Sequence, residues 1–113
     1  MEFCVAYITC ESEKEALSIG RVLVQKRLAA CVNVLGGMKS VYWWENDVQT
    51  SQEVVLLAKT TRPRMAALIE EVKALHSYDT PCVIALPVID GSPDYFNWLR
   101  DSLEATKSIE TRK

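Results

Sequence analysis

The chain has 113 residues, the size of one domain, and a chain of this length buries roughly two thirds of the surface that it exposes when unfolded. Its 13 basic and 15 acidic side chains give a formal charge of -2, without a run of like charges or a basic stripe. This balance argues against a nucleic-acid partner and against binding to an anionic membrane surface.

The amino-terminal segment and the cysteines predict where the protein resides. The first ten residues, MEFCVAYITC, carry an acid where a secretory signal needs basic residues, and their apolar run is too short to span a bilayer. The cysteines lack CxxC spacing and the density of a small secreted disulfide framework. We therefore expect a cytoplasmic protein with reduced, mostly buried thiols at Cys4, Cys10, Cys31 and Cys82.

The first two elements are predicted from local signals. The run from Phe3 to Thr9 is apolar and rich in β-forming residues, which indicates a strand. Ser12 followed by Glu15 has the spacing of a capping box, so a helix is expected to begin there. Gly20 within this helix predicts a close approach to whatever lies beneath it.

Residues 31–45 and 48–59 are predicted to form a hairpin of two long strands around a turn at Asn46 and Asp47. Two glycines in succession, at positions 36 and 37, indicate a bulge or kink in the first strand. Both strands exceed the usual length of about 5 or 6 residues. Part of the hairpin is therefore expected to project beyond the rest of the sheet.

The projecting part of the hairpin carries three adjacent aromatic residues, Tyr42, Trp43 and Trp44. Successive side chains of a strand point to opposite faces, so both faces of this segment need cover. A hairpin that extends outside its own domain core has little else to pack on. We therefore predict that these three residues form an assembly interface; a binding cleft lined by Trp43 and Trp44 is the alternative.

A second helix is predicted after the hairpin, with Thr61 as its N-cap, Pro63 in its first turn and His76 at its end. Residues 82–89 follow as an apolar strand. This strand contains Pro87, which cannot donate to a β-ladder, so an edge position is expected. The inward stripe of the second helix consists of Met65, Leu68, Ile69, Val72 and Leu75.

A short last helix is predicted to begin at Ser92 and Pro93. Residues 104–113 have one large apolar position and are expected to form a polar carboxy-terminal tail, so residues 1–103 make up the single domain. The inward positions of the last helix are Tyr95, Phe96, Leu99 and Leu103.

The order βαββαβ with a terminal helix predicts an α+β, ferredoxin-like fold. Right-handed crossovers place both main helices on one face of the four-stranded antiparallel sheet. The first strand is nonetheless apolar on both sides, with Phe3, Val5 and Tyr7 opposite Cys4, Ala6 and Ile8. We therefore expect the second face of the sheet to be buried in a partner.

Motifs for phosphate binding, dinucleotide binding, acyl transfer and zinc proteases are not found in the sequence, and an enzyme is not expected. Cys10 and His76 are suitable donors for a transition metal, and these two residues could lie at one end of the sheet. Cys82 is a possible third donor. The simpler interpretation has Cys10 as a core residue and His76 as a helix cap. The segment of Lys59, Thr60 and Thr61, at the amino end of the second helix, could hold an anion.

Five segments, "RLAACVN", "YWWE", "EVVLLAKTT", "LHSYDTP" and "YFNWL", resemble the CutA family of divalent-cation tolerance proteins, from about Cys4 to Leu103. The resemblance implies a ferredoxin-like fold in a homotrimer similar to PII signalling proteins, with links to copper and other divalent metals. It places the metal-associated cysteine at Cys10 and the motif histidine at His76. The sequence departs from the family in Ser77, where proline is usual, and in Cys82, where glutamate is frequent.

Our leading hypothesis is a cytoplasmic homotrimer that binds copper or another divalent ion weakly, acts in metal tolerance and has no organic cofactor. A PII-like signalling scaffold is the first alternative, with a small anionic effector bound in intersubunit clefts near Lys59 and the hairpin. The second alternative is an interaction module that organises other proteins. Both of the first two hypotheses require the same trimer.

Overall fold

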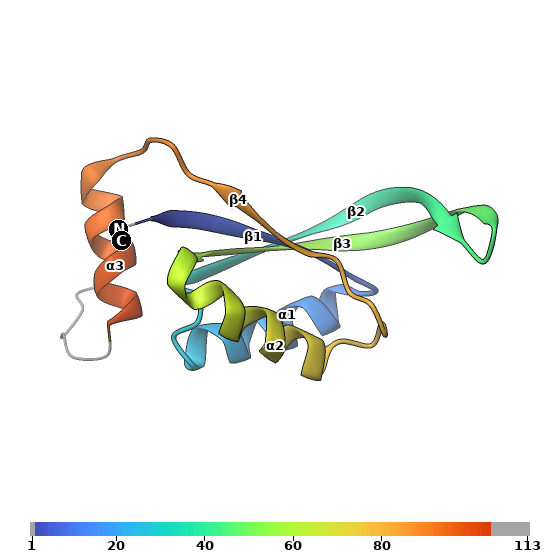
Figure 1. The fold of residues 1–113 in the computed structure, drawn as a ribbon, viewed down its shortest axis with the longest axis horizontal. Helices are drawn as coiled ribbons and strands as arrows, with labels where there is room; N and C mark the ends of the chain where they lie inside the picture. Colours follow the sequence, from blue (N-terminus) through green and yellow to red (C-terminus); the bar gives the residue numbers. More distant parts are fainter. Residues whose placement is uncertain (1, 105–113) are drawn as a thin grey trace.

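The computed structural model describes residues 2–104 as a four-stranded antiparallel sheet in the order β2-β3-β1-β4 (Figure 1). Helices α1 and α2 cover one face of the sheet, and α3 stands across one end. The predicted ferredoxin-like order is confirmed; residues 105–113 of the predicted tail lie outside the described residues. The elements are β1 (Phe3–Cys10), α1 (Glu13–Gln25), β2 (Cys31–Trp44), β3 (Asp47–Thr61), the 3-10 turn η1 (Arg62–Arg64), α2 (Met65–Leu75), β4 (Val83–Pro87) and α3 (Pro93–Leu103).

Helix α1 begins as its cap predicts. The Ser12 hydroxyl oxygen accepts a hydrogen bond from the Glu15 amide at 3.1 Å. The Glu15 carboxylate accepts from the amide of Glu11, also at 3.1 Å, and not from that of Ser12 as in a regular capping box. Gly20 is buried, and a Cβ added there would lie 2.8 Å from Cγ2 of Val32, so the predicted close approach of α1 to the sheet is confirmed.

Strand β1 separates the two faces of the sheet. Cys4, Ala6, Ile8 and Cys10 are buried in the core that the sheet forms with α1 and α2. The intervening residues are only half-buried, because α1 and α2 lie on the other side of the sheet and α3 lies only at one end of it (Figure 1). We call this side the open face; on β1 it carries Phe3, Val5, Tyr7 and Thr9.

The β2–β3 hairpin projects beyond the helices (Figure 1). Its pairing runs from Cys31 opposite Lys59 to Trp44 opposite Asp47, with a bulge between Leu35 and Met38 at the two glycines. The turn residues are Glu45 and Asn46, both with positive φ, as a two-residue hairpin turn of type I′ requires. The turn therefore lies one residue earlier than predicted, because Asp47 is already paired.

Helix α2 begins later than predicted, because the 3-10 turn η1 intervenes. The Thr61 hydroxyl accepts a hydrogen bond from Arg64 at 2.9 Å and makes no cap bond. Leu75, expected to face inward, is exposed at the end of α2. Strand β4 is shorter than the predicted 82–89 and lies at the sheet edge, as Pro87 indicated.

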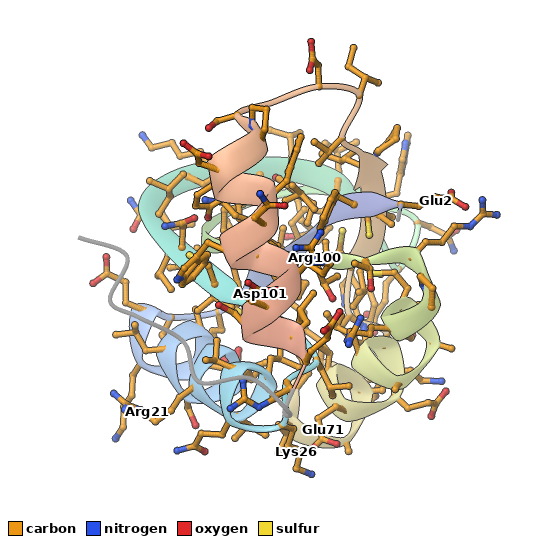
Figure 2. All side chains as sticks on the ribbon, turned by 90° about the vertical axis from the view of Figure 1, so that its left-hand side faces the viewer. Glu2, Arg21, Lys26, Glu71, Arg100 and Asp101 are labelled. Carbon is orange, nitrogen blue, oxygen red and sulfur yellow. The ribbon has the colours of Figure 1, made fainter. Side chains whose placement is uncertain are left out.

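Helix α3 is anchored at the amino end of β1, where the Phe3 and Phe96 rings stack with centroids 4.7 Å apart. Figure 2 looks from the α3 end: α3, with Arg100 and Asp101 labelled, passes in front of the sheet. Lys26 and Glu71 meet beneath it, where an ion pair of 2.8 Å joins α1 to α2. No helix within residues 2–104 has the length and apolar character that a bilayer span needs.

Candidate functional site

Cys10, Glu15 and His76 meet at one end of the sheet, where β1 leads into α1 and α2 ends. Their potential donor atoms all lie within 4.8 Å of one another. It is the one group of three or more potential metal donors this close together in residues 2–104. The structure thus brings together two of the three predicted residues, Cys10 and His76, and adds Glu15, which the sequence presented only as a capping residue.

Cys82 lies apart from this group. The register of β1 with β4 ends at Ile8 opposite Val83, and its continuation places Cys82 opposite Thr9 on the open face. Burial and the Glu53 carboxylate raise the pKa of the Cys82 thiol, and Thr9 acts to lower it, which agrees with this placement. Cys10 points to the helix-covered face, so the two thiols are on opposite sides of the sheet.

The imidazole of His76 uses both of its nitrogens in hydrogen bonds. Nε2 lies 2.7 Å from the carbonyl oxygen of Thr9, and the amide of Tyr78 donates to Nδ1 at 3.0 Å. A carbonyl oxygen can only accept and an amide N–H can only donate, so the partners assign the proton to Nε2. The ring is therefore the neutral Nε2–H tautomer, with no lone pair left over.

Cys10 and Glu15 are also held in contacts within the protein. The Cys10 thiol is fully buried, and burial, with the Glu15 and Glu53 carboxylates, raises its pKa to about 12. The two Glu15 oxygens accept from the amides of Glu11 at 3.1 Å and Ser77 at 2.9 Å. Burial acts to raise the pKa of Glu15, but these hydrogen bonds and nearby His76 outweigh it, so the net direction is downward.

Coordination of a divalent transition metal through Cys10 and His76 would need a thiolate and a free imidazole lone pair. Here the thiol keeps its proton at neutral pH and the ring has no free nitrogen. As arranged, Cys10 and His76 offer no free donor to a divalent cation, and only the Glu15 carboxylate keeps lone pairs for one. His76 is also the C-cap of α2, and its amide donates to the carbonyl of Val72. This position agrees with the simpler interpretation, in which His76 is a helix cap.

The turn after His76 is tied to the base of the hairpin. The Tyr78 hydroxyl donates to the Glu53 carboxylate at 2.9 Å, and burial together with Glu53 raises the pKa of Tyr78. Glu53 is buried and pairs with Met38, next to the bulge of β2. Sequence reasoning missed this contact, because only the register of the hairpin brings Glu53 next to the turn.

The aromatic residues predicted to form an interface are exposed in the single chain. Tyr42, Trp43 and Trp44 are 41%, 75% and 59% accessible. Ile84 and Leu86 of β4 pair with Tyr7 and Val5, which places them on the open face, and they too are exposed. The chain therefore presents exposed apolar side chains on the open face and on the hairpin that its own residues 2–104 leave uncovered.

Lys59 lines a cavity of about 310 Å³ between the open face and α3, together with Phe3, Tyr95 and Asp90. Its ammonium group donates to the Tyr95 hydroxyl at 3.3 Å and lies 5.3 Å from the centre of the Tyr95 ring. The neighbouring Thr60 hydroxyl donates to the carbonyl of Leu28. Of the predicted anion-binding segment, only Lys59 therefore faces the cavity.

Residues 4–102 match the family model of the CutA1 divalent ion tolerance protein. The chain is 46% identical over 98 residues to the divalent-cation tolerance protein CutA of Thermus thermophilus, covering 87% of this chain and 95% of that relative. It spans only 60% of the length of the mouse protein CutA, to which it is 40% identical over 94% of this chain.

Among solved structures, CutA1 from Oryza sativa superimposes with a TM-score of 0.89 at 40% identity, covering 94% of this chain and 97% of that one. The periplasmic divalent cation tolerance protein CutA from Archaeoglobus fulgidus gives a TM-score of 0.87 at 38% identity, covering 90% and 99% of the two chains. This chain thus shares its fold with these proteins and matches their sequences over most of its length.

Proposed function

Because the chain belongs to the CutA1 divalent ion tolerance family, we propose that it acts in divalent-cation tolerance as a homotrimer and catalyses no reaction. The observation that carries the assembly is the open face, where Ile84 and Leu86 stay exposed. Each apolar side chain of this size gains roughly 1.5 to 3 kcal/mol when it is fully buried. Three copies related by symmetry would supply that burial.

We place Tyr42, Trp43 and Trp44 in the subunit interface, because the projecting hairpin lies outside the core of its own chain (Figure 1). Aromatic residues are enriched at such interfaces. Sedimentation of the purified protein at micromolar concentration tests this part of the proposal. A trimer is expected, and a stable monomer would contradict it.

We propose that copper or another divalent ion binds weakly, since Cys10 keeps its proton and His76 has no free ring nitrogen, which leaves only the Glu15 carboxylate as a ready donor. Calorimetric titration of the reduced protein with Cu, Zn and Ni tests this. Copper is expected to bind more tightly than zinc or nickel. Any binding through thiolate or imidazole should weaken as the pH falls, because protons compete for the same lone pairs. The absence of saturable binding of any of the three ions would contradict the cation-binding part.

A PII-like signalling scaffold remains the second candidate, and the cavity at Lys59 is the observation that favours it. A small anionic effector would find the ammonium group there next to the Tyr95 ring. Asp90 lines the same cavity and opposes an anion. Effector binding that needs no metal and is lost in Lys59→Met would favour this candidate over cation tolerance.

We also propose a cytoplasmic location. None of the four cysteines forms a disulfide in the structure, as is expected in reducing surroundings. Fractionation of the cells that produce the protein tests the location directly. Recovery in a secreted or membrane fraction would contradict it.

A further inference from the structure

We infer that His76 is a positioning residue, a neutral bridge between the Thr9 carbonyl of β1 and the Tyr78 amide, and is not a ligand of the cation. The inference rests on the proposed function only for the choice of cation. The bridge itself is present whether or not a cation binds elsewhere on the protein.

The bridge is one of three contacts made by successive residues of the turn after α2. His76 bonds to Thr9 of β1, the Ser77 amide donates to Glu15 of α1, and the Tyr78 hydroxyl donates to Glu53 of β3. The His76 and Tyr78 rings also touch, with centroids 4.7 Å apart. The turn is thereby fixed to three elements, and one of these contacts lies at the base of the projecting hairpin.

A cation at His76 would have to break part of this arrangement. Binding at Nδ1 removes the acceptor of the Tyr78 amide, and binding at Nε2 removes the proton that the Thr9 carbonyl accepts. Both backbone groups take part in part-buried contacts, where an unpaired donor or acceptor is costly. Cys10 would in addition have to lose a proton inside the core. The neutral bridge is therefore favoured over coordination.

The chain contains a single histidine, so its imidazole nitrogen signals are assigned without ambiguity in untagged protein labelled with ¹⁵N-histidine. At neutral pH the spectrum is expected to show the Nε2–H tautomer. Added Zn²⁺, which is diamagnetic, is expected to leave both ring nitrogen signals in place. A large shift of either signal on zinc saturation would identify His76 as a ligand and overturn the inference.

Amide hydrogen exchange at Tyr78 tests the positioning role by a second route. Exchange in His76→Ala is expected to be faster by up to about tenfold, the factor that one backbone hydrogen bond supports. His76→Asn is the matched control: an asparagine oxygen can accept from the amide two residues later, as in an Asx-turn, so it keeps the Tyr78 contact. Equal exchange in the wild type and His76→Ala would contradict the bridge.

Tyr78→Phe separates the bridge from the contact beyond it. This variant loses the bond to Glu53 and keeps the amide bond to Nδ1, so the tautomer of His76 should persist. If neither zinc nor copper nor nickel binds saturably to the wild type, the cation part of the proposed function is contradicted, while the tautomer and the exchange rates still decide the inference. A change of tautomer in Tyr78→Phe would show that the ring is not held by its two backbone partners.

Discussion

The two faces of the sheet are made from similar residues and have different environments. On β1, Ile8 is fully buried under α1 and α2, whereas Val5 and Tyr7 are half-buried on the open face. Both sets are apolar or aromatic, so the difference comes from α1 and α2, which cover one side only (Figure 1). The core of a single chain therefore accounts for the apolar residues of the helix-covered face. The apolar residues of the open face indicate that it is covered by assembly with other copies.

The largest expected effect is on the helix-covered face. Leu56→Ala removes a fully buried side chain from the core of β3, and such changes cost about 2–5 kcal/mol of unfolding free energy. Leu57→Ala is the matched change on the open face, one residue along the same strand. Denaturant unfolding at low protein concentration should show a clearly smaller loss for Leu57→Ala. Equal losses would mean that the two faces are equally packed within one chain.

The hairpin gives the next largest effect. Trp44→Ala is expected to weaken assembly by about 2 kcal/mol or more, as truncation of a buried interface aromatic does. Sedimentation should show a shift toward monomer, and the unfolding temperature of the wild type should rise with protein concentration. Leu17→Ala is the control, because Leu17 is also exposed but lies on α1. A Trp44→Ala protein that assembles like the wild type would remove the hairpin from the interface.

The two thiols on opposite faces sharpen the comparison further. Cys10 is buried under the helices with a pKa of about 12, whereas Cys82 is half-exposed on the open face. Alkylation of the native protein should therefore modify Cys82 well before Cys10. After denaturation, mass spectrometry should find four modified cysteines. Modification of native Cys10 at the rate of Cys82 would contradict the burial of its thiol.

The sequence predicted those features that depend on neighbouring residues. Ser12 specified the start of α1, Gly20 the close approach to the sheet, and Pro87 the edge position of β4. It did not predict that Glu15 joins Cys10 and His76, or that Tyr78 reaches Glu53, because these contacts depend on strand register and on the path of a turn. The opposite placement of Cys82 follows from the β1–β4 register, which one sequence does not specify.

The smallest expected effect concerns acid stability at Glu15, on the helix-covered side. Its pKa is lowered from the ordinary value of 4.5, so folding favours the carboxylate. The corresponding stability is present above pH 4.5 and is lost as the pH falls through the lower folded pKa. Glu15→Gln should therefore be less stable than the wild type at neutral pH, and the difference should shrink in acid. Glu13→Gln is the control, since Glu13 is an exposed acid in the same first turn. Thermal unfolding of the wild type and both variants, measured from pH 7 to pH 3, gives the comparison. A stability difference between the wild type and Glu15→Gln that stays constant over this range would show that the Glu15 charge does not stabilise the turn through Ser77.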